Sequence, residues 1–394
     1  MNILILRKEA KNLKGYAEYM EENSFRFYLI EYWRNIDKKI LFCFFILFFL
    51  GIFFSFSSTS SLAGERLNKD FYLFFTKHLI FTFFSLIIMI LISLIRTEFL
   101  VELTLPLFII SFISLTLGPI IGIEVKGAKR WLDLYFFRLQ PIEILKPFFI
   151  LATVRILTLD QFKNSQIKYI LSFFLLSSVI ILLIDQPDLG QSILLIGSWV
   201  ATVFVSGVSL VYISIFLLIF FITIGSLLYF LPEKFGYIIN RLIMFFDPSQ
   251  GDKFQSSSAL DAIQLGGLTG QGMGEGILKE SVPEAHTDYV IAVISEEYGS
   301  LVSIMILIIF LYISFRIIKN CFNQENDFLK ISLSGLATLL IFQTFIHAGV
   351  NTSLLPTTGM TLPFLSYGGS SLVGSAILAG LVLNYTKNKS YLYD

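Results

Sequence analysis

The feature that most constrains this chain is a series of apolar runs, each about twenty residues long. A run of this length crosses the hydrocarbon core of a bilayer as one helix, whereas the apolar stripe of a soluble helix recurs every three or four residues. Hydrophobic residues make up 55% of the sequence and charged residues only 15%, which is more apolar surface than a soluble domain can bury. Strands of a transmembrane β-barrel would alternate over about ten residues, and such segments are not found. The sequence therefore predicts an all-α polytopic membrane protein.

We expect about ten transmembrane helices. They are predicted at residues 40–57, 73–95, 100–121, 141–158, 168–184, 189–206, 209–231, 287–315, 328–352 and 367–386. The membrane domain then covers 40–386, between short tails at 1–39 and 387–394. Residues 232–286 are too many for a simple connector, and we expect a large extracytoplasmic loop there, between helices seven and eight, with a short helix near 259–262.

The distribution of Lys and Arg predicts the orientation. Residues 1–39 hold eight of these cations, which is typical of the cytoplasmic side. An even number of spans places both termini there and the 232–286 loop outside. The formal net charge is zero, so the composition indicates no nucleic-acid partner.

One short external loop, 122–140, departs from this charge distribution because it carries Lys126, Lys129, Arg130 and Arg138. An anionic ligand would explain four cations on the outer side, since Arg binds phosphate through two parallel hydrogen bonds. Contact with anionic lipid head groups would explain them too, and both explanations stay open.

Ionisable residues lie at or near membrane depth in several predicted helices. Such residues are costly in a bilayer and are functional candidates. Glu143 and Lys146 are three residues apart on one helix face, so they could form a structural ion pair or line a cavity. Asp188 follows the external turn between spans five and six, where it could cap the next helix or face the same outer site.

The stretch 283–299 concentrates these features. His286 and Asp288 stand at the mouth of the predicted eighth span, and Glu296 and Glu297 lie inside its apolar run. A helix cap is the simplest role for an Asp at a helix start. We nevertheless expect Asp288 to be the working carboxylate of an enzyme that acts on a lipid-linked substrate.

Two glycine-containing segments accompany these residues. The run 266–276 is not preceded by a strand or followed by Gly-Lys-Ser/Thr, so it is no nucleotide loop; its flexible backbone would let the loop fold over a site. Gly368 and Gly369, followed by Ser370, begin the tenth span. This start could offer free amides to an anion, or it could permit close helix packing.

Six motifs occur in a fixed order along the chain. They are Gly127-Ala128-Lys129-Arg130-Trp131, Gln140-Pro141-x-Glu143, Gln186-Pro187-Asp188-Leu189-Gly190, Pro283-Glu284-Ala285-His286-Thr287-Asp288, Glu296-Glu297 and Leu362–Ser371. Together they resemble the SEDS family (shape, elongation, division and sporulation proteins) over roughly residues 30–386. The glycine-rich run and residues 357–371 are more similar to the cell-division branch than to the elongation branch.

The resemblance implies a ten-helix fold and a peptidoglycan glycosyltransferase. The enzyme would polymerise lipid II, a disaccharide-pentapeptide on undecaprenyl diphosphate, in the plasma (inner) membrane of a bacterium at the division septum. Its implied partners are a class B penicillin-binding protein, which supplies transpeptidation, and other membrane proteins of the division machinery.

The resemblance makes Asp288 the catalytic position. We expect substrate contacts from Lys129, Arg130, Glu143, Lys146, Asp188, His286, Thr287, Ser366, Tyr367, Gly368, Gly369 and Ser370. Asp288 would take a proton from the acceptor sugar's 4-hydroxyl, and Arg130, Lys129 and Lys146 would stabilise the departing diphosphate. The sequence establishes no cofactor; assistance by a divalent cation such as Mg or Mn stays open, although no ligand set is defined.

Three other functions remain as alternatives. A transporter that flips lipid II across the membrane would also use cationic cavities and polar helix interruptions, but it needs a path through both halves, and the unusual polar residues gather in the outer half. A non-catalytic scaffold would tolerate Asp288→Asn. An elongation-type polymerase of the same family would share the chemistry.

Overall fold

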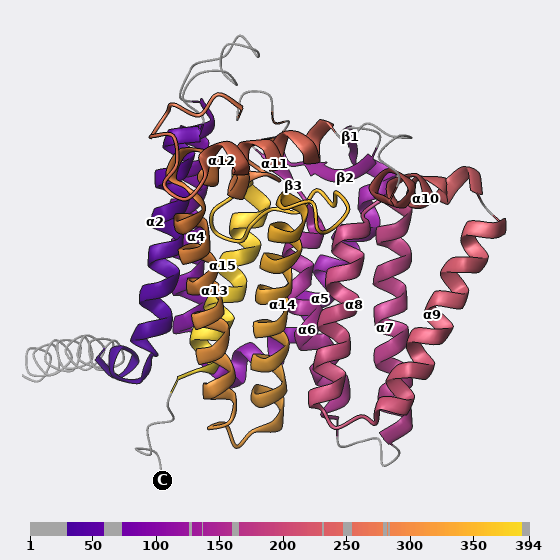
Figure 1. The fold of residues 1–394 in the computed structure, drawn as a ribbon. Helices are drawn as coiled ribbons and strands as arrows, with labels where there is room; N and C mark the ends of the chain where they lie inside the picture. The colour runs from indigo at the N-terminus through magenta and orange to yellow at the C-terminus, as the bar shows by residue number, and fades with distance from the viewer. Residues whose placement is uncertain are drawn as a thin grey trace, which may run out of the picture.

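The computed structural model describes residues 30–58, 73–125, 128–135, 137–159, 165–230, 232–246, 254–278, 282 and 284–387. Long helices form a bundle, and shorter helices and a small sheet lie across one end of it (Figure 1). The long helices are α2 (Lys38–Ser58), α4 (Leu73–Leu94), α5 (Thr97–Ile121), α6 (Pro141–Leu157), α7 (Ser165–Asp185), α8 (Leu189–Val205), α9 (Leu210–Phe230), α13 (Ser300–Cys321), α14 (Asp327–Asn351) and α15 (Gly369–Tyr385). The shorter ones are α10 (Pro232–Phe246), α11 (Phe254–Gly266) and α12 (Val290–Tyr298).

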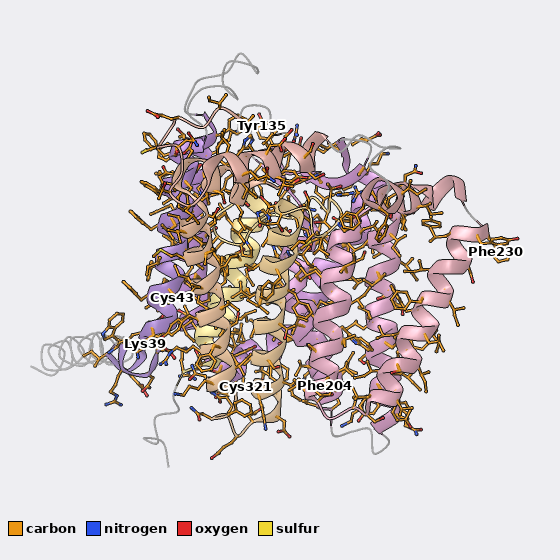
Figure 2. The ribbon with its side chains drawn as sticks, viewed as in Figure 1. Lys39, Cys43, Tyr135, Phe204, Phe230 and Cys321 are labelled. Carbon is orange, nitrogen blue, oxygen red and sulfur yellow. The ribbon has the colours of Figure 1, made fainter. Side chains whose placement is uncertain are left out.

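Within this described part of the chain, seven helices are long and apolar enough to cross a membrane, namely α2, α4, α5, α7, α9, α13 and α14. Helices α8 and α15 are apolar but shorter, and α6 is buried over almost its whole length. Large apolar side chains such as Phe204 and Phe230 point outward from the bundle (Figure 2). The prediction of an all-α polytopic membrane protein is confirmed, while the number of helices that cross the bilayer stays a prediction.

The eighth predicted span, 287–315, is interrupted in the structure. Helix α12 ends at Tyr298 and α13 begins at Ser300, with Gly299 between them at a φ of 87°. A Cβ on Gly299 would lie 2.1 Å from the carbonyl oxygen of Leu268, so the break has a conformation and a close approach that only glycine permits. The span is Ser300–Cys321. The prediction that Glu296 and Glu297 lie inside this span is therefore wrong, because both belong to α12.

The region predicted as a large loop, 232–286, contains two helices. Helix α11 includes the short helix expected near 259–262, and α10 precedes it. The glycine-rich run was expected to be flexible, but its first part packs on α12: Gln271 N donates to the Glu296 carbonyl at 2.8 Å. A Cβ on Gly270 would lie 2.2 Å from the carbonyl oxygen of Glu297, so glycine permits this contact. Residues 247–253, 279–281 and 283 lie outside the described part.

The external loop 122–140 forms an antiparallel sheet of β1 (Ile123–Val125), β2 (Ala128–Asp133) and β3 (Arg138–Leu139). Leu132 pairs with Leu139 and Asp133 with Arg138. The sheet lies at the same end of the bundle as α11 and α12 (Figure 1). Side chains alternate between the faces of a strand, so consecutive cations of β2 point in different directions.

The α14–α15 connection is part of the core at that same end. Its Phe364 is 1% exposed and packs against the rings of Phe44, Phe48 and Phe310, with centroid distances of 5.3, 5.0 and 6.4 Å. These rings come from α2 and α13 as well as from the connection. The connection is therefore fixed between the helices, rather than exposed as a surface loop, and this position brings it to the candidate site.

Candidate active site

Five consecutive residues of the α14–α15 connection, Thr357–Thr361, join most of the predicted site, and we call them the central strap. Together the strap residues contact α8, α10, α14 and the turn that carries Asp288. Three strap carbonyls form hydrogen bonds: Thr357 O with Arg241 NH1 at 3.4 Å, Met360 O with His347 Nδ1 at 2.8 Å, and Thr361 O with Gln343 Nε2 at 3.0 Å. The other two strap residues make close contacts, Thr358 with Gly190 and Gly359 with Asp288. Residues that are far apart in the sequence thus meet along one short segment.

Asp288 is half-buried in the turn that leads into α12. Its backbone N–H donates to Glu284 O at 3.0 Å, and its carbonyl accepts from Asn351 Nδ2 at 3.0 Å. The carboxylate faces the strap, because Oδ2 lies 3.6 Å from the position that a Cβ on Gly359 would occupy. The N-cap of α12 is Tyr289, without a side-chain cap bond. The simple capping role considered for Asp288 is therefore not the one that the structure shows.

The residues on either side of Asp288 attach this turn to the start of α15. Tyr367 N donates to His286 O at 2.9 Å, and Ser366 Oγ donates to Thr287 O at 2.6 Å. The His286 ring lies 6.1 Å from the Tyr367 ring. The structure thus brings these four predicted site residues together beside Asp288.

The start of α15 is a packing site. A Cβ on Gly369 would lie 2.6 Å from the ring of Phe81. Ser370 is 2% exposed; its hydroxyl accepts from Gln140 N at 2.9 Å and donates to Arg138 O at 3.1 Å. Close packing through small residues, one of the two alternatives, is thus observed, and an anion on the amides of this helix start stays a prediction.

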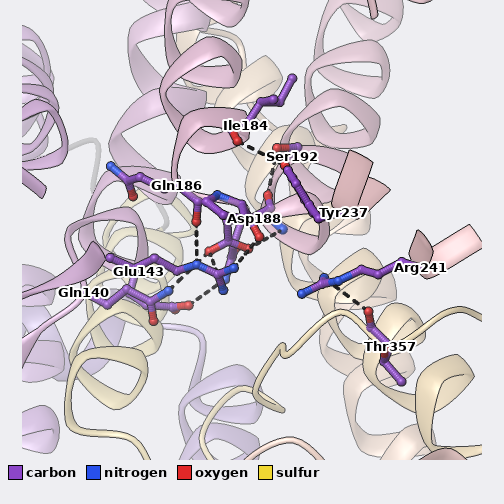
Figure 3. A network of polar contacts seen from close by, with 12 residues as sticks. Gln140, Glu143, Ile184, Gln186, Asp188, Ser192, Tyr237, Arg241 and Thr357 are labelled. Atoms are coloured by element: carbon purple, nitrogen blue, oxygen red, sulfur yellow. Dashed lines mark hydrogen bonds and ion pairs between the residues drawn. The ribbon is translucent and has the colours of Figure 1, made fainter. Parts of the chain in front are cut away.

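Arg130 and Asp188 meet at the turn between α7 and α8, where Figure 3 shows Asp188 beside Gln186. Arg130 Nε donates to Gln186 O at 2.6 Å, NH2 donates to Pro187 O, and NH1 lies 3.8 Å from Asp188 Oδ2. Asp188 is 3% exposed and also accepts from Gln191 N at 3.4 Å, so it caps α8. Burial raises the pKa of Asp188, and the positive charge of Arg130 opposes that rise.

Glu143 and Lys146 form an ion pair inside the bundle. Lys146 Nζ lies 2.8 Å from Glu143 Oε2, and both side chains are 4% exposed. Gln191 Nε2 donates to Glu143 Oε1 at 2.8 Å, and Lys146 Nζ donates to Gln343 Oε1 at 3.0 Å. Gln343 in turn donates to Thr361. The ion-pair alternative is observed, and it connects α6, α8 and α14 to the central strap.

Helix α10 supplies two site residues that the sequence argument missed. Tyr237 donates to Ile184 O at 3.0 Å, and Arg241 donates to Thr357 O (Figure 3). Burial raises the pKa of Tyr237 to about 12. Phe235 and Ile238 are buried on the same helix face. The signal that could have found them is helical periodicity: residues 235, 237, 238 and 241 share one face of an amphipathic helix in what was expected to be a loop.

Two glutamates hold α12 in place. Glu296 is 0% exposed, and its Oε1 accepts from Leu278 N at 2.7 Å. Glu297 is 1% exposed and accepts from Ser57 Oγ of α2. These contacts fix α12, and with it the Asp288 turn, to the glycine-rich segment and to the first long helix.

Lys129 is exposed on β2, next to Arg130 in sequence but on the other face of the strand. The structure does not bring it to the buried polar network. Among the described residues, no group of three or more His, Cys, Asp or Glu side chains is placed to hold a metal ion. A role for Mg or Mn stays a prediction.

Comparison with known proteins supports the same family throughout the chain. The family model for FtsW, RodA and SpoVE, described as "Cell cycle protein", matches residues 37–391. The probable peptidoglycan glycosyltransferase FtsW of Caulobacter vibrioides is 30% identical over 362 residues, which cover 92% of this chain and 92% of the relative. Its counterpart in Wigglesworthia glossinidia brevipalpis is 33% identical over 357 residues, which cover 86% and 93%.

Solved structures have the same fold. A chain in the structure described as "Structural coordination of polymerization and crosslinking by a peptidoglycan synthase complex" matches with a TM-score of 0.71 and 24% identity, covering 89% of this chain and 97% of that one. Rod shape determining protein RodA of Thermus thermophilus matches with a TM-score of 0.65 and 24% identity, covering 89% and 96%. The chain is an integral membrane protein, and it belongs to the SEDS family, the cell cycle proteins of the FtsW, RodA and SpoVE type.

Proposed function

We propose that this chain is a peptidoglycan glycosyltransferase of the FtsW type, which polymerises lipid II into glycan strands. Relatives that match most of its length are named for this activity. The observation that carries the proposal is the position of Asp288, whose half-buried carboxylate faces one side of the central strap while Arg241 binds the same strap two residues away. A carboxylate and a cation on one short segment supply the two charges that glycosyl transfer from a diphosphate requires.

Asp288 acts as the general base in this proposal. It takes the proton from the 4-hydroxyl of the acceptor sugar, whose oxygen then forms a bond to the anomeric carbon of the donor. The bond between that carbon and the diphosphate oxygen breaks, and its electron pair leaves with undecaprenyl diphosphate. A single displacement inverts the anomeric configuration, so one base on the attacking side is enough. The leaving group is an anion, so it needs positive charge rather than a proton.

The predicted cations differ in how they could serve the leaving group. Arg130 is held by two backbone carbonyls and by Asp188, yet 17% of its side chain remains exposed. Lys146 is buried against Glu143, so a direct contact with substrate would require this pair to open. Lys129 is exposed on the sheet. Arg130 is therefore the strongest of the three, and Lys146 supports the strap through Gln343.

The place of work and the partner follow from the family. We infer that both termini are cytoplasmic and that the strap end of the bundle faces outward, where lipid-linked sugars are polymerised. We further infer that the enzyme works at the division septum with a class B penicillin-binding protein and other membrane proteins of division. The complex to which one structural neighbour belongs coordinates polymerisation with crosslinking, which supports a partner of this kind.

The test is glycan-strand formation from purified lipid II, with the chain and its cognate class B penicillin-binding protein together in liposomes. We expect polymer that lysozyme digests, in the presence of an antibiotic that blocks the transpeptidase. A translocation assay with fluorescent lipid II runs on the same liposomes. Absence of polymer together with translocation of lipid II would reject the transferase and favour a transporter.

A further inference from the structure

Arg241 is a half-buried cation to which the proposed mechanism has assigned no contact with substrate. Its one hydrogen bond to the described residues is the 3.4 Å contact with Thr357 O. No carboxylate within the described ranges lies at ion-pair distance from it. Burial lowers the pKa of Arg241, and the positive charge of Arg130 lowers it further, while Asp188 acts in the opposite direction. A guanidinium with so little compensation is costly unless an anion binds there.

The carboxylate that acts on Arg241 is already engaged by another cation. Arg130 NH1 lies 3.8 Å from Asp188 Oδ2, and Asp188 is the carboxylate whose negative charge also acts on Arg241. The nitrogens of Arg130 already face two carbonyls and that carboxylate. Arg241 has five N–H donors and uses one of them, weakly, on the strap. The remaining donors form the planar fork that matches a phosphate.

Helix α10 does not depend on Arg241 for its position. Phe235 and Ile238 are each 8% exposed and anchor its inner face, and Tyr237 adds the hydrogen bond to Ile184 O. The helix is thus held by three neighbours of Arg241 on the same face, of which Figure 3 shows Tyr237 beside Ile184. A guanidinium that is not needed to dock its own helix is available for a ligand.

Arg241 and the proposed base, Asp288, both contact the central strap. Arg241 bonds Thr357, and the Asp288 carboxylate lies beside Gly359. Two residues of chain span about 7 Å at most, so both groups act on the same small space. We propose that Arg241 binds the diphosphate of the lipid-linked donor and, together with Arg130, stabilises the charge that develops on the leaving oxygen. This inference rests on the proposed glycosyltransferase function and adds the residue that receives the leaving group.

The experiment uses the full chain with its class B penicillin-binding protein. Initial rates of lipid II polymerisation are measured for wild type, Arg241→Gln, Arg241→Lys, Tyr237→Phe and Lys77→Gln. Lys77 is an exposed cation on α4, so its variant makes the same charge change without touching the site. Inhibition of each protein is titrated with undecaprenyl diphosphate, and with undecaprenol as the same chain without phosphate.

Loss of a charged hydrogen-bonding partner should lower kcat/KM by at least about tenfold in Arg241→Gln. Inhibition by undecaprenyl diphosphate should weaken in parallel, and inhibition by undecaprenol should not change. Arg241→Lys should recover part of both effects because it restores the charge but not the fork. Lys77→Gln should behave as wild type.

Two outcomes would overturn the inference while the proposed function stands. In one, wild type polymerises lipid II and Arg241→Gln keeps both its kcat/KM and its affinity for undecaprenyl diphosphate. In the other, Arg241→Gln and Tyr237→Phe lose activity equally with diphosphate affinity unchanged, which would make Arg241 a residue that only docks α10. If wild type itself makes no polymer, the transferase proposal fails. Direct binding of undecaprenyl diphosphate to wild type and to Arg241→Gln then tests the Arg241 site by itself, and equal affinity of the two proteins would reject it.

Discussion

Breaking the Glu143–Lys146 pair from one side should be among the most damaging substitutions in the bundle. In Glu143→Gln, the Lys146 ammonium would remain 4% exposed with only amide oxygens near it. Removing one partner of a buried pair costs about 3–5 kcal/mol, because the remaining charge is no longer compensated. Replacing both partners, as in Glu143→Gln with Lys146→Met, removes the charge as well and should cost only about 0–2 kcal/mol.

A matched ion pair at the opposite end of the bundle provides the control. Arg316 Nε lies 2.8 Å from Asp37 Oδ2, the same separation as in the buried pair, but the Arg316 side chain is 26% exposed. Asp37→Asn leaves the Arg316 guanidinium behind, and water can solvate it. The cost of Asp37→Asn should therefore be about 1 kcal/mol or less.

The free energy of unfolding would be measured by SDS titration in mixed micelles for the single variants, the double variant and Asp37→Asn. We predict a coupling free energy between Glu143 and Lys146 of at least about 2 kcal/mol. Single effects that simply add in the double variant, or a Glu143→Gln cost no larger than that of Asp37→Asn, would refute the argument that burial makes this pair critical.

Three further substitutions test other contacts. Gly270 and Gly274 have similar φ angles of 82° and 81°, but a Cβ added to Gly270 would lie 2.2 Å from a carbonyl oxygen, whereas the surroundings of Gly274 are open. Gly270→Ala should therefore cost several times more stability than Gly274→Ala. Equal melting temperatures of the two variants would contradict this. Ser57→Ala should cost about 1–3 kcal/mol because it removes a buried hydrogen bond to the Glu297 carboxylate. The cost would be measured by the same SDS titration against Ser114→Ala on the exposed face of α5. Burial raises the pKa of Asp188 above the unfolded value of about 3.9, so its bound proton stabilises the fold fully below about pH 4, and this stabilisation is lost as the pH rises through the folded pKa. The free energy of unfolding of wild type relative to Asp188→Asn should therefore fall over this pH range. A difference between the two proteins that does not vary with pH would contradict this prediction.

The sequence predicts the positions of the long helices well, because the length of each apolar run is enough to identify them. A helix occupies each of the ten expected positions, because a long apolar stretch has no other way to satisfy its backbone in a bilayer. The break at Gly299 is not visible in this signal, since α12 is itself apolar and continues the run into α13. Helix α10 is not predicted for a different reason. It is amphipathic, and it lies in the region 232–286, whose length and polarity predict a loop.

The sequence predicts many of the residues of the candidate site, but it predicts few of the contacts between them. Asp288, Arg130 and the Glu143–Lys146 pair were found as charges at unusual depth or in family motifs. Gln343, which joins that pair to the strap, shares one face of its helix with His347 and Asn351; this spacing predicts a polar inner face but not the bonds to Lys146 and Thr361. Nor does the sequence show that five residues of one connection contact α8, α10, α14 and the Asp288 turn, because such contacts depend on tertiary packing alone.

The most direct test of the account is the rate of glycan polymerisation by Asp288→Asn. The matched control is Asp261→Asn, an exposed Asp on α11 at the same end of the bundle. Both variants would be assayed with the partner transpeptidase, after checks of melting temperature and partner binding. Loss of a general base should reduce the rate at least about a hundredfold in Asp288→Asn, with Asp261→Asn close to wild type. Polymerisation by a folded Asp288→Asn protein at the rate of Asp261→Asn would contradict the central claim.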